Sequence, residues 1–112
     1  ILPSTLTSIG NEAFYNCDDL VNIDLPEGLT HIGDEAFIYC HDLSIIRIPD
    51  SVTHVGFDAF YGCDNLTVHG YGGTAIEKYA YENNIEFVVI DEDEEEDEDD
   101  YYDEEEYEEE MV

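Results

Sequence analysis

The feature that most constrains the fold is an internal repeat with a period of 23 residues. Aligning the chain on itself at this offset superimposes similar or identical residues over most of residues 1–70. The matching sets are Leu2, Leu25 and Ile48 before proline; Ile9, Ile32 and Val55 before glycine; Ala13, Ala36 and Ala59; Phe14, Phe37 and Phe60; Cys17, Cys40 and Cys63; and Leu20, Leu43 and Leu66. Repeats of this length indicate a solenoid, whose equivalent turns bury their apolar sides against one another. Residues 1–70 are therefore predicted to form about three stacked turns.

Each repeat contains one segment with the pattern of a β-strand. In residues 20–25, Ile23 and Leu25 alternate with polar residues, and Pro26 ends the pairing because proline has no N–H to donate. A second apolar set follows the proline, and it mixes helix-like spacing with a glycine: Leu29, Ile32, Ala36, Phe37 and Cys40. The pattern predicts one short parallel strand per turn, followed by a tight turn with about one turn of helix.

Stacking places equivalent residues in columns about 4.8 Å apart, the spacing of neighbouring strands. The three repeat phenylalanines are predicted to form one interior column and the three cysteines another. The three repeat alanines are predicted to lie where the backbones crowd. The cysteines are interpreted as buried structural thiols, although neighbouring turns are close enough for one disulfide, which would leave one thiol over.

A different closing unit is predicted after Leu66. At the 23-residue spacing, His69 and Tyr71 stand where Ile46 and Ile48 stood, and glycines follow. Residues 74–77, Thr-Ala-Ile-Glu, match a capping box, in which the threonine and glutamate side chains satisfy free N–H groups at a helix start. We predict a cap over residues 71–90, with a helix at about 75–83 and a strand at about 85–90.

The charge of the chain is strongly negative, with 31 acidic and two basic residues and a net charge of −29. Nucleic acids and anionic membranes are bound through Lys and Arg, so the composition argues against both as direct partners. Residues 91–112 hold 17 of the acidic residues and are predicted to be a disordered polyacidic tail. The tail is expected to attract Ca²⁺ weakly or to attract basic proteins; a solubilising tail or a linker is the alternative.

Residues 17–37 and 40–60 resemble the BspA-type leucine-rich repeat, whose motif runs Cys-x-x-Leu-x-x-Ile-x-Leu-Pro and then Val/Leu-x-x-Ile-Gly-x-x-Ala-Phe. Residues 73–87 resemble the unit that often caps such arrays, so the resemblance covers about residues 2–90. It implies an α/β fold: a short leucine-rich-repeat solenoid with a C-terminal helix–strand cap. Since the first turn lacks a leading strand, we expect these residues to end a longer array.

Nothing in the sequence indicates catalysis or a cofactor. The cysteines and the four histidines lack the closely spaced ligand pairs of a zinc site, and no nucleophile or metalloprotease motif occurs. His31 and His54 share a repeat position and are expected to stack on an outer face. Asn65 opens an Asn-Leu-Thr sequon that matters only if the protein is secreted through a glycosylating pathway.

The resemblance implies a function in binding, since its better-studied members are adhesins on bacterial surfaces or in parasitic protists. The first hypothesis is therefore a cell-surface or secreted module that binds a host matrix or cell-surface protein. Its expected ligand face contains outward residues of the strands: Asn22, Asp24, Ser44, Ile45 and Arg47. The alternatives are a cytoplasmic or nuclear protein that chaperones basic proteins such as histones through its tail, and a structural spacer.

Overall fold

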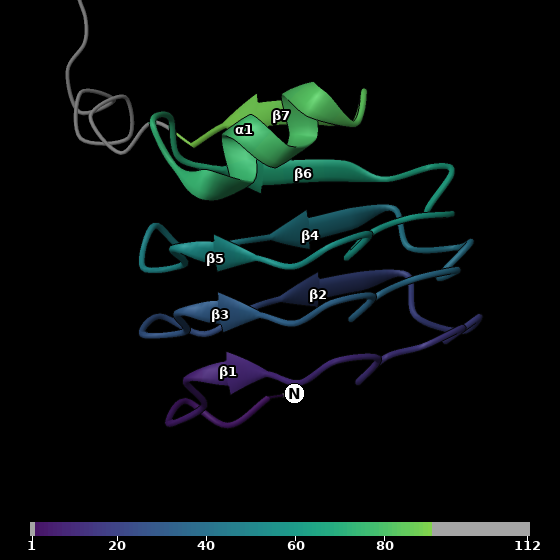
Figure 1. Ribbon diagram of the computed structural model, residues 1–112, viewed down its shortest axis with the longest axis horizontal. Coiled ribbons are helices and arrows are strands. Elements are labelled where there is room, and N and C mark those ends of the chain that lie inside the picture. The colour runs from purple at the N-terminus through teal and green to yellow at the C-terminus, as the bar shows by residue number, and fades with distance from the viewer. Residues whose placement is uncertain (1, 91–112) are drawn as a thin grey trace, which may run out of the picture.

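The computed structural model describes residues 2–90. The predicted acidic tail, with its expected disorder and weak Ca²⁺ binding, lies outside these residues. Within the described part, the chain winds through stacked turns, and each turn passes through two parallel sheets (Figure 1). The predicted solenoid is confirmed. None of the helices in residues 2–90 is long and apolar enough to cross a membrane.

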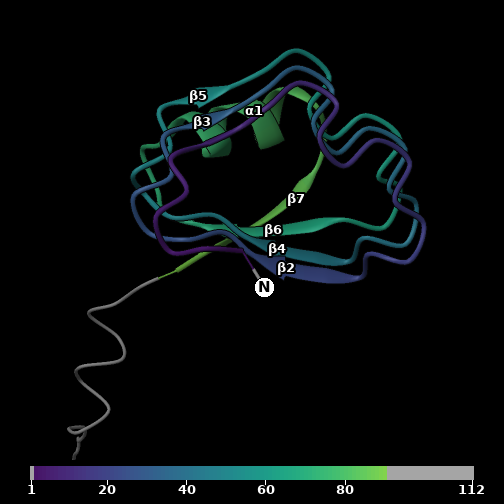
Figure 2. The ribbon, with the colours of Figure 1, turned by 90° about the horizontal axis from the view of Figure 1, so that it is seen from below.

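The two sheets lie on opposite sides of the stack, with the core between them (Figure 2). The long sheet has the order β2-β4-β6-β7 and consists of β2 (Asn22–Asp24), β4 (Ile45–Arg47), β6 (Thr67–Gly70) and β7 (Glu86–Val89). The short sheet has the order β1-β3-β5 and consists of β1 (Ser8–Ile9), β3 (His31–Ile32) and β5 (His54–Val55). One helix, α1 (Ala75–Glu82), lies between β6 and β7 in the described sequence.

The prediction of one strand per turn is wrong, because the segment after the proline adds a strand of two residues to the short sheet. Its amides bond across turns, as in the bonds from Thr30 N to Thr7 O and from Gly33 N to Ile9 O, both 2.8 Å. The expected turn of helix is also missing. Phe14 N donates to Ala36 O of the next turn at 2.7 Å, and Glu35 has a φ of +57°, which interrupts a right-handed helix.

The spacing between turns changes from 23 to 22 residues at β6. Ile45 pairs with Asn22 on one side and with Thr67 on the other. This slip places Val68 opposite Ile46, fully buried, and turns His69 outward. The interpretation that His69 replaces a core isoleucine is therefore wrong. A shift of one residue exchanges the inner and outer faces of a strand, so a small change in spacing reverses the assignment.

The interior columns follow the repeat. The rings of Phe14 and Phe37 are stacked at 4.9 Å and those of Phe37 and Phe60 at 5.1 Å, nearly parallel in both cases. Phe37 and Phe60 are buried, whereas Phe14, in the first described turn, is half-buried. Ala36 and Ala59 are fully buried, but Ala13 is exposed.

The cysteine column uses its thiols as donors. Cys40 Sγ donates to Phe14 O at 3.0 Å, and Cys63 Sγ donates to Phe37 O at 3.1 Å. All three cysteines, which lie within the described residues, are free, and Cys17 is half-buried. Burial raises the pKa of the Cys63 thiol to about 12. The two buried thiols are therefore protonated at neutral pH and serve packing.

The cap ends the stack by providing the hydrogen-bond acceptor and the packed ring that a further turn would provide. Phe60 N, which would otherwise donate to a carbonyl of the next turn, donates to the Tyr79 hydroxyl at 3.1 Å. The Tyr79 ring packs edge-on against Phe60 at 5.9 Å. The helix start has the expected chemistry, since Thr74 Oγ1 accepts from Glu77 N and Glu77 Oε1 accepts from Gly73 N at 2.7 Å. Terminal units of solenoids have this covering role.

Candidate functional site

Strand register brings together four of the five predicted ligand-face residues. Asn22 pairs with Ile45 and Asp24 pairs with Arg47 across β2 and β4. Ser44 lies one residue before β4 and is held by the chain itself, because its N–H donates to Val21 O at 2.7 Å and its hydroxyl to Asp42 O at 3.1 Å. Ser44 therefore borders this surface.

The outer face of the long sheet extends beyond the predicted residues, onto β6 and β7. Its outward positions form two rows across the strands, and we call them the strand face: Asn22, Ile45, Thr67 and Glu86 in one row, and Asp24, Arg47, His69 and Val88 in the other. Thr67 and His69 were missed because the 23-residue spacing was extended past the point where it changes. Glu86 and Val88 were missed because the strand at about 85–90 was assigned to the cap and not to this sheet. The alternation of Thr67, Val68 and His69 was the signal that could have shown the residues on β6.

The strand face is polar with two exposed apolar side chains. Ile45 and Val88 are exposed, while the inward residues of the same strands, including Ile46 and Val68, are fully buried. The face carries both signs of charge, since Asp24 pairs with Arg47 across β2 and β4 and Glu86 lies on β7. Mixed polar residues around exposed apolar side chains are typical of protein-binding surfaces rather than of catalytic clefts.

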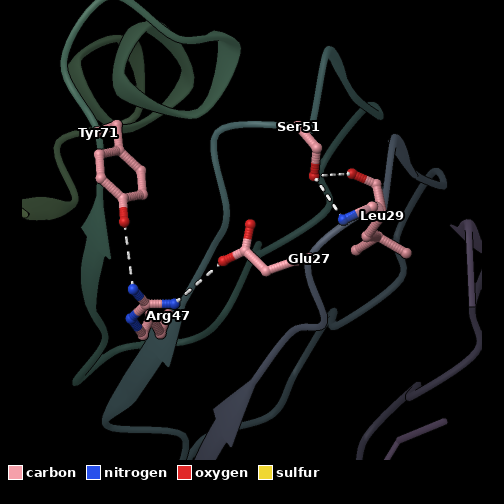
Figure 3. A network of polar contacts seen from close by, with 6 residues as sticks. Glu27, Leu29, Arg47, Ser51 and Tyr71 are labelled. Carbon is pink, nitrogen blue, oxygen red and sulfur yellow. Dashed lines mark hydrogen bonds and ion pairs between the residues drawn. The ribbon is translucent and has the colours of Figure 1, made fainter. Parts of the chain in front are cut away.

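Arg47 is held in place from two neighbouring turns (Figure 3). Its Nη1 lies 3.7 Å from Glu27 Oε2, and its Nη2 donates to the Tyr71 hydroxyl at 3.2 Å. The Glu27 carboxylate is largely exposed, so this ion pair stabilises the fold by no more than about 1 kcal/mol. Its main effect is to orient the guanidinium group at one end of the strand face.

Ser51 ties the adjacent loop to the turn before it. Its hydroxyl donates to Leu29 O at 2.6 Å and accepts from Gly28 N at 3.2 Å (Figure 3). Gly28 has a φ of +94°, a conformation that side chains rarely adopt. The loop that carries Glu27 is thus fixed by its neighbour, and the border of the strand face is preorganised.

The predicted histidine pair lies on the opposite sheet. The rings of His31 and His54 are 5.4 Å apart, and His31 Nδ1 is 2.8 Å from Thr30 Oγ1. In residues 2–90, no group of three or more Cys, His, Asp and Glu side chains is arranged to hold a metal ion. These contacts indicate a ladder of solvated side chains along the short sheet.

Two hollows lie at opposite ends of the described stack. One of about 270 Å³ lies between the last turn and the cap, beside Phe60, Cys63 and Tyr79. The other, about 810 Å³, lies against the first described turns, where Phe14, Leu20 and Ile23 are half-buried. Neither hollow gathers the acid, base and nucleophile that hydrolytic or transfer chemistry requires.

Comparisons with known proteins support the same fold. A family model described as the BspA type leucine-rich repeat region matches residues 1–94. A solved leucine-rich repeat protein from Bacteroides ovatus ATCC 8483 is 39% identical, superimposes with a TM-score of 0.70, and covers 80% of this chain. This chain spans 24% of the length of that protein. A search of curated proteins found no match. The resemblance drawn from the repeat motif is confirmed.

Proposed function

Because the chain belongs to the BspA-type leucine-rich repeat family, we propose that it is a non-enzymatic protein-binding module of a cell-surface or secreted protein. We further propose that the module contacts its partner through the strand face. The expected partner is a host matrix or cell-surface protein. Proteins of this kind use a rigid stack of turns to present side chains to a ligand.

One observation carries the proposal: along the long sheet, inward positions repeat in type and outward positions do not. Ile23, Ile46 and Val68 are all apolar and point inward, whereas the outward neighbours in one row are Asn22, Ile45, Thr67 and Glu86. Inward positions are constrained by packing. The outward positions are free of that constraint, and their variety gives each turn a different contact to offer.

The size of the strand face sets an expectation for affinity. Four strands at about 4.8 Å spacing span only about 14 Å between the outer strands. Stable interfaces bury about 800 Å² on each partner, so a face of this width favours weak or multivalent binding. Ile45 and Val88 are its exposed apolar anchors, and Arg47 is its preorganised charged group.

The test is a binding assay with the full chain immobilised at physiological salt. Extracellular-matrix proteins and intact host cells are passed over the wild type and over the double variant Ile45→Ser/Val88→Ser. The control is Phe57→Ser, which removes an apolar side chain that is 72% exposed but lies outside the strand face. We expect about tenfold weaker binding for the double variant and unchanged binding for the control. Failure of the wild type to bind any of these partners, or equal loss in both variants, would contradict the proposal.

The net charge of −29 favours a second candidate function, an intracellular chaperone of basic proteins such as histones. In that case residues 91–112 provide the binding through their carboxylates, and the attraction weakens as salt screens it. Deleting residues 91–112 should then abolish salt-sensitive histone binding while circular dichroism shows the repeats intact. Equal binding by the shortened chain would rule this function out.

A further inference from the structure

Three exposed tyrosines from successive turns form a ladder on the connections from the short sheet to the long sheet. These connections stack at the right of Figure 2, away from the strand face. We call Tyr15, Tyr39 and Tyr61 the tyrosine ladder; they are 53%, 37% and 56% exposed. Neighbouring rings meet edge to face, with centroids 6.1 Å and 5.8 Å apart. The rings thus form one continuous aromatic surface.

The backbone is shaped to hold the middle ring outside. Tyr15 and Tyr61 occupy the same repeat position, but the residue between them, Ile38, is buried in the middle turn. Tyr39, the next residue, fills the gap with a φ of +63°, which a bulky residue rarely adopts. Gly62 makes room for it, since a Cβ there would lie 2.6 Å from Tyr39 Cδ1. Asn16 and Gly62 also have a positive φ at this repeat position, so the conformation belongs to the repeat and Tyr39 occupies an outward position of it.

Carboxylates border the tyrosine ladder on both sides along the chain. Tyr15 N donates to Glu12 O and Tyr61 N donates to Asp58 O, both at 3.1 Å, so each acid lies in the same tight turn as its tyrosine. Asp18 and Asp64 follow each tyrosine by three residues and are exposed. In the middle turn this position is His41, whose ring lies 6.0 Å from that of Tyr39.

Within residues 2–90, no Lys or Arg pairs with these carboxylates, and Asp18 Oδ1 lies 3.8 Å from His41 Nδ1. Glu35, the equivalent of Glu12 in the middle turn, has its pKa raised by desolvation, by a hydrogen bond with the Glu12 side chain and by neighbouring acidic charges. The two basic residues of the chain make their ion pairs elsewhere, Arg47 with Glu27 and Lys78 with Glu82. The border of the ladder is therefore a region of unbalanced negative charge.

We propose that the tyrosine ladder, with its bordering carboxylates, binds an arginine-rich peptide segment of a partner protein that lies across the turns. Guanidinium groups stack on the faces of tyrosine rings and pair with carboxylates through their N–H groups. The turns repeat about every 4.8 Å, so an extended peptide running along the stack meets a new ring at each turn. This surface is separate from the strand face, and the inference does not depend on the proposed function.

Charge favours a peptide over the other common ligand of exposed aromatic surfaces, a neutral oligosaccharide. Sugar rings also stack on tyrosine, but they do not balance the negative charge of Glu12, Glu35, Asp58, Asp18 and Asp64. A cationic peptide provides both the planar groups for the rings and the opposite charge. The oligosaccharide is kept as an outcome of the test.

The test uses the full chain and a fluorescent peptide of alternating arginine and glycine, with anisotropy measured at physiological salt. The ladder variant is Tyr15→Ser/Tyr39→Asn/Tyr61→Ser, in which asparagine suits the left-handed position because Asn16 already occupies its equivalent with a φ of +56°. The control is Tyr81→Ser, which removes an exposed tyrosine from α1. Circular dichroism verifies that each variant is folded.

We expect the ladder variant to bind the peptide about tenfold more weakly and the control to bind it as the wild type does, since each cation–π contact at an exposed site changes affinity by about two- to fivefold. Chemical shifts in the ¹⁵N-labelled chain should change most at residues 12–18, 35–41 and 58–64. Unchanged affinity of the ladder variant, which would locate the binding in the acidic segment 91–112, would overturn the proposal. Binding of a neutral oligosaccharide at the ladder without binding of the peptide would do so as well.

Discussion

Replacing Phe37 by alanine tests the stacked interior most severely. Phe37 is fully buried, and it is the phenylalanine whose ring lies between two others, at 4.9 Å from Phe14 and 5.1 Å from Phe60. Truncating a buried phenylalanine to alanine lowers the free energy of unfolding by about 3 to 5 kcal/mol. Each aromatic ring pair that is lost accounts for about 0.5 to 1.5 kcal/mol beyond the effect of buried area. We therefore expect Phe37→Ala to lower the free energy of unfolding by about 4 kcal/mol.

The size of this loss can be set against the stability of the whole fold. About 90 folded residues correspond to a free energy of unfolding of about 5 to 13 kcal/mol. With a urea m-value of about 1 to 1.5 kcal/mol/M, a loss of about 4 kcal/mol lowers the midpoint of urea unfolding by about 3 M. Circular dichroism during urea titration of the wild type and the variant measures this shift directly.

Two further alanine variants serve as references for the loss of stability in Phe37→Ala. Phe14 is half-buried and stacks on one ring, so Phe14→Ala should cost about half as much as Phe37→Ala. Phe57 is 72% exposed, so Phe57→Ala should change the free energy of unfolding by no more than about 0.5 kcal/mol. If Phe37→Ala cost no more than Phe57→Ala, the stacked column would not be what stabilises the turns.

Three other predictions concern single groups. Gly62→Ala should destabilise the fold by about 1 to 2 kcal/mol in urea unfolding, because φ is +81° and the new Cβ meets the Tyr39 ring. Tyr79→Phe should cost about 1 to 3 kcal/mol in the same assay, because Phe60 N loses its acceptor. The Cys63 thiol, with its pKa raised to about 12, favours the folded state below pH 9, and this contribution should be lost as the pH rises from about 9 to 12. Urea midpoints across that range, compared with Cys63→Ala, measure the loss.

Each of these predictions has an outcome that contradicts it. Gly10→Ala is the control for Gly62→Ala, since a Cβ at Gly10 meets no atom within 4 Å, and equal losses would remove the role assigned to Tyr39 packing. A Tyr79→Phe variant as stable as the wild type would show that the cap does not need the hydroxyl. A midpoint with the same pH dependence in the wild type and in Cys63→Ala would show that this thiol does not titrate differently on folding.

The parts of the fold that the sequence predicts are those that repeat unchanged. Phe14, Phe37 and Phe60 recur at one spacing because each turn must fill the same interior site, and the repeat alone indicates the stack. The helix of the cap was also predicted, since the Thr74 and Glu77 side chains accept hydrogen bonds from backbone N–H groups only three or four residues away in the sequence. Interactions of this kind are local or periodic, so the residue pattern is enough to predict them.

The parts that the sequence did not predict depend on backbone pairing between distant residues. Strands β1, β3 and β5 have two residues each, too few for alternation to be recognised, and only their hydrogen bonds to neighbouring turns define them. The loss of one residue of spacing at Thr67 leaves the match of Leu66 to Leu43 intact, so the change of register is invisible in the alignment. Thr67 and His69, the strand-face residues on β6, were missed for this reason.

The register between β4 and β6 decides which side chains form the strand face, and it can be measured directly. In a ¹³C,¹⁵N-labelled full chain, we predict nuclear Overhauser contacts between the buried side chains of Ile46 and Val68, with the half-buried His69 ring on the outer face of the sheet. Contacts between Ile46 and a buried His69 ring would contradict this register, and with it the outward surface assigned here to partner binding.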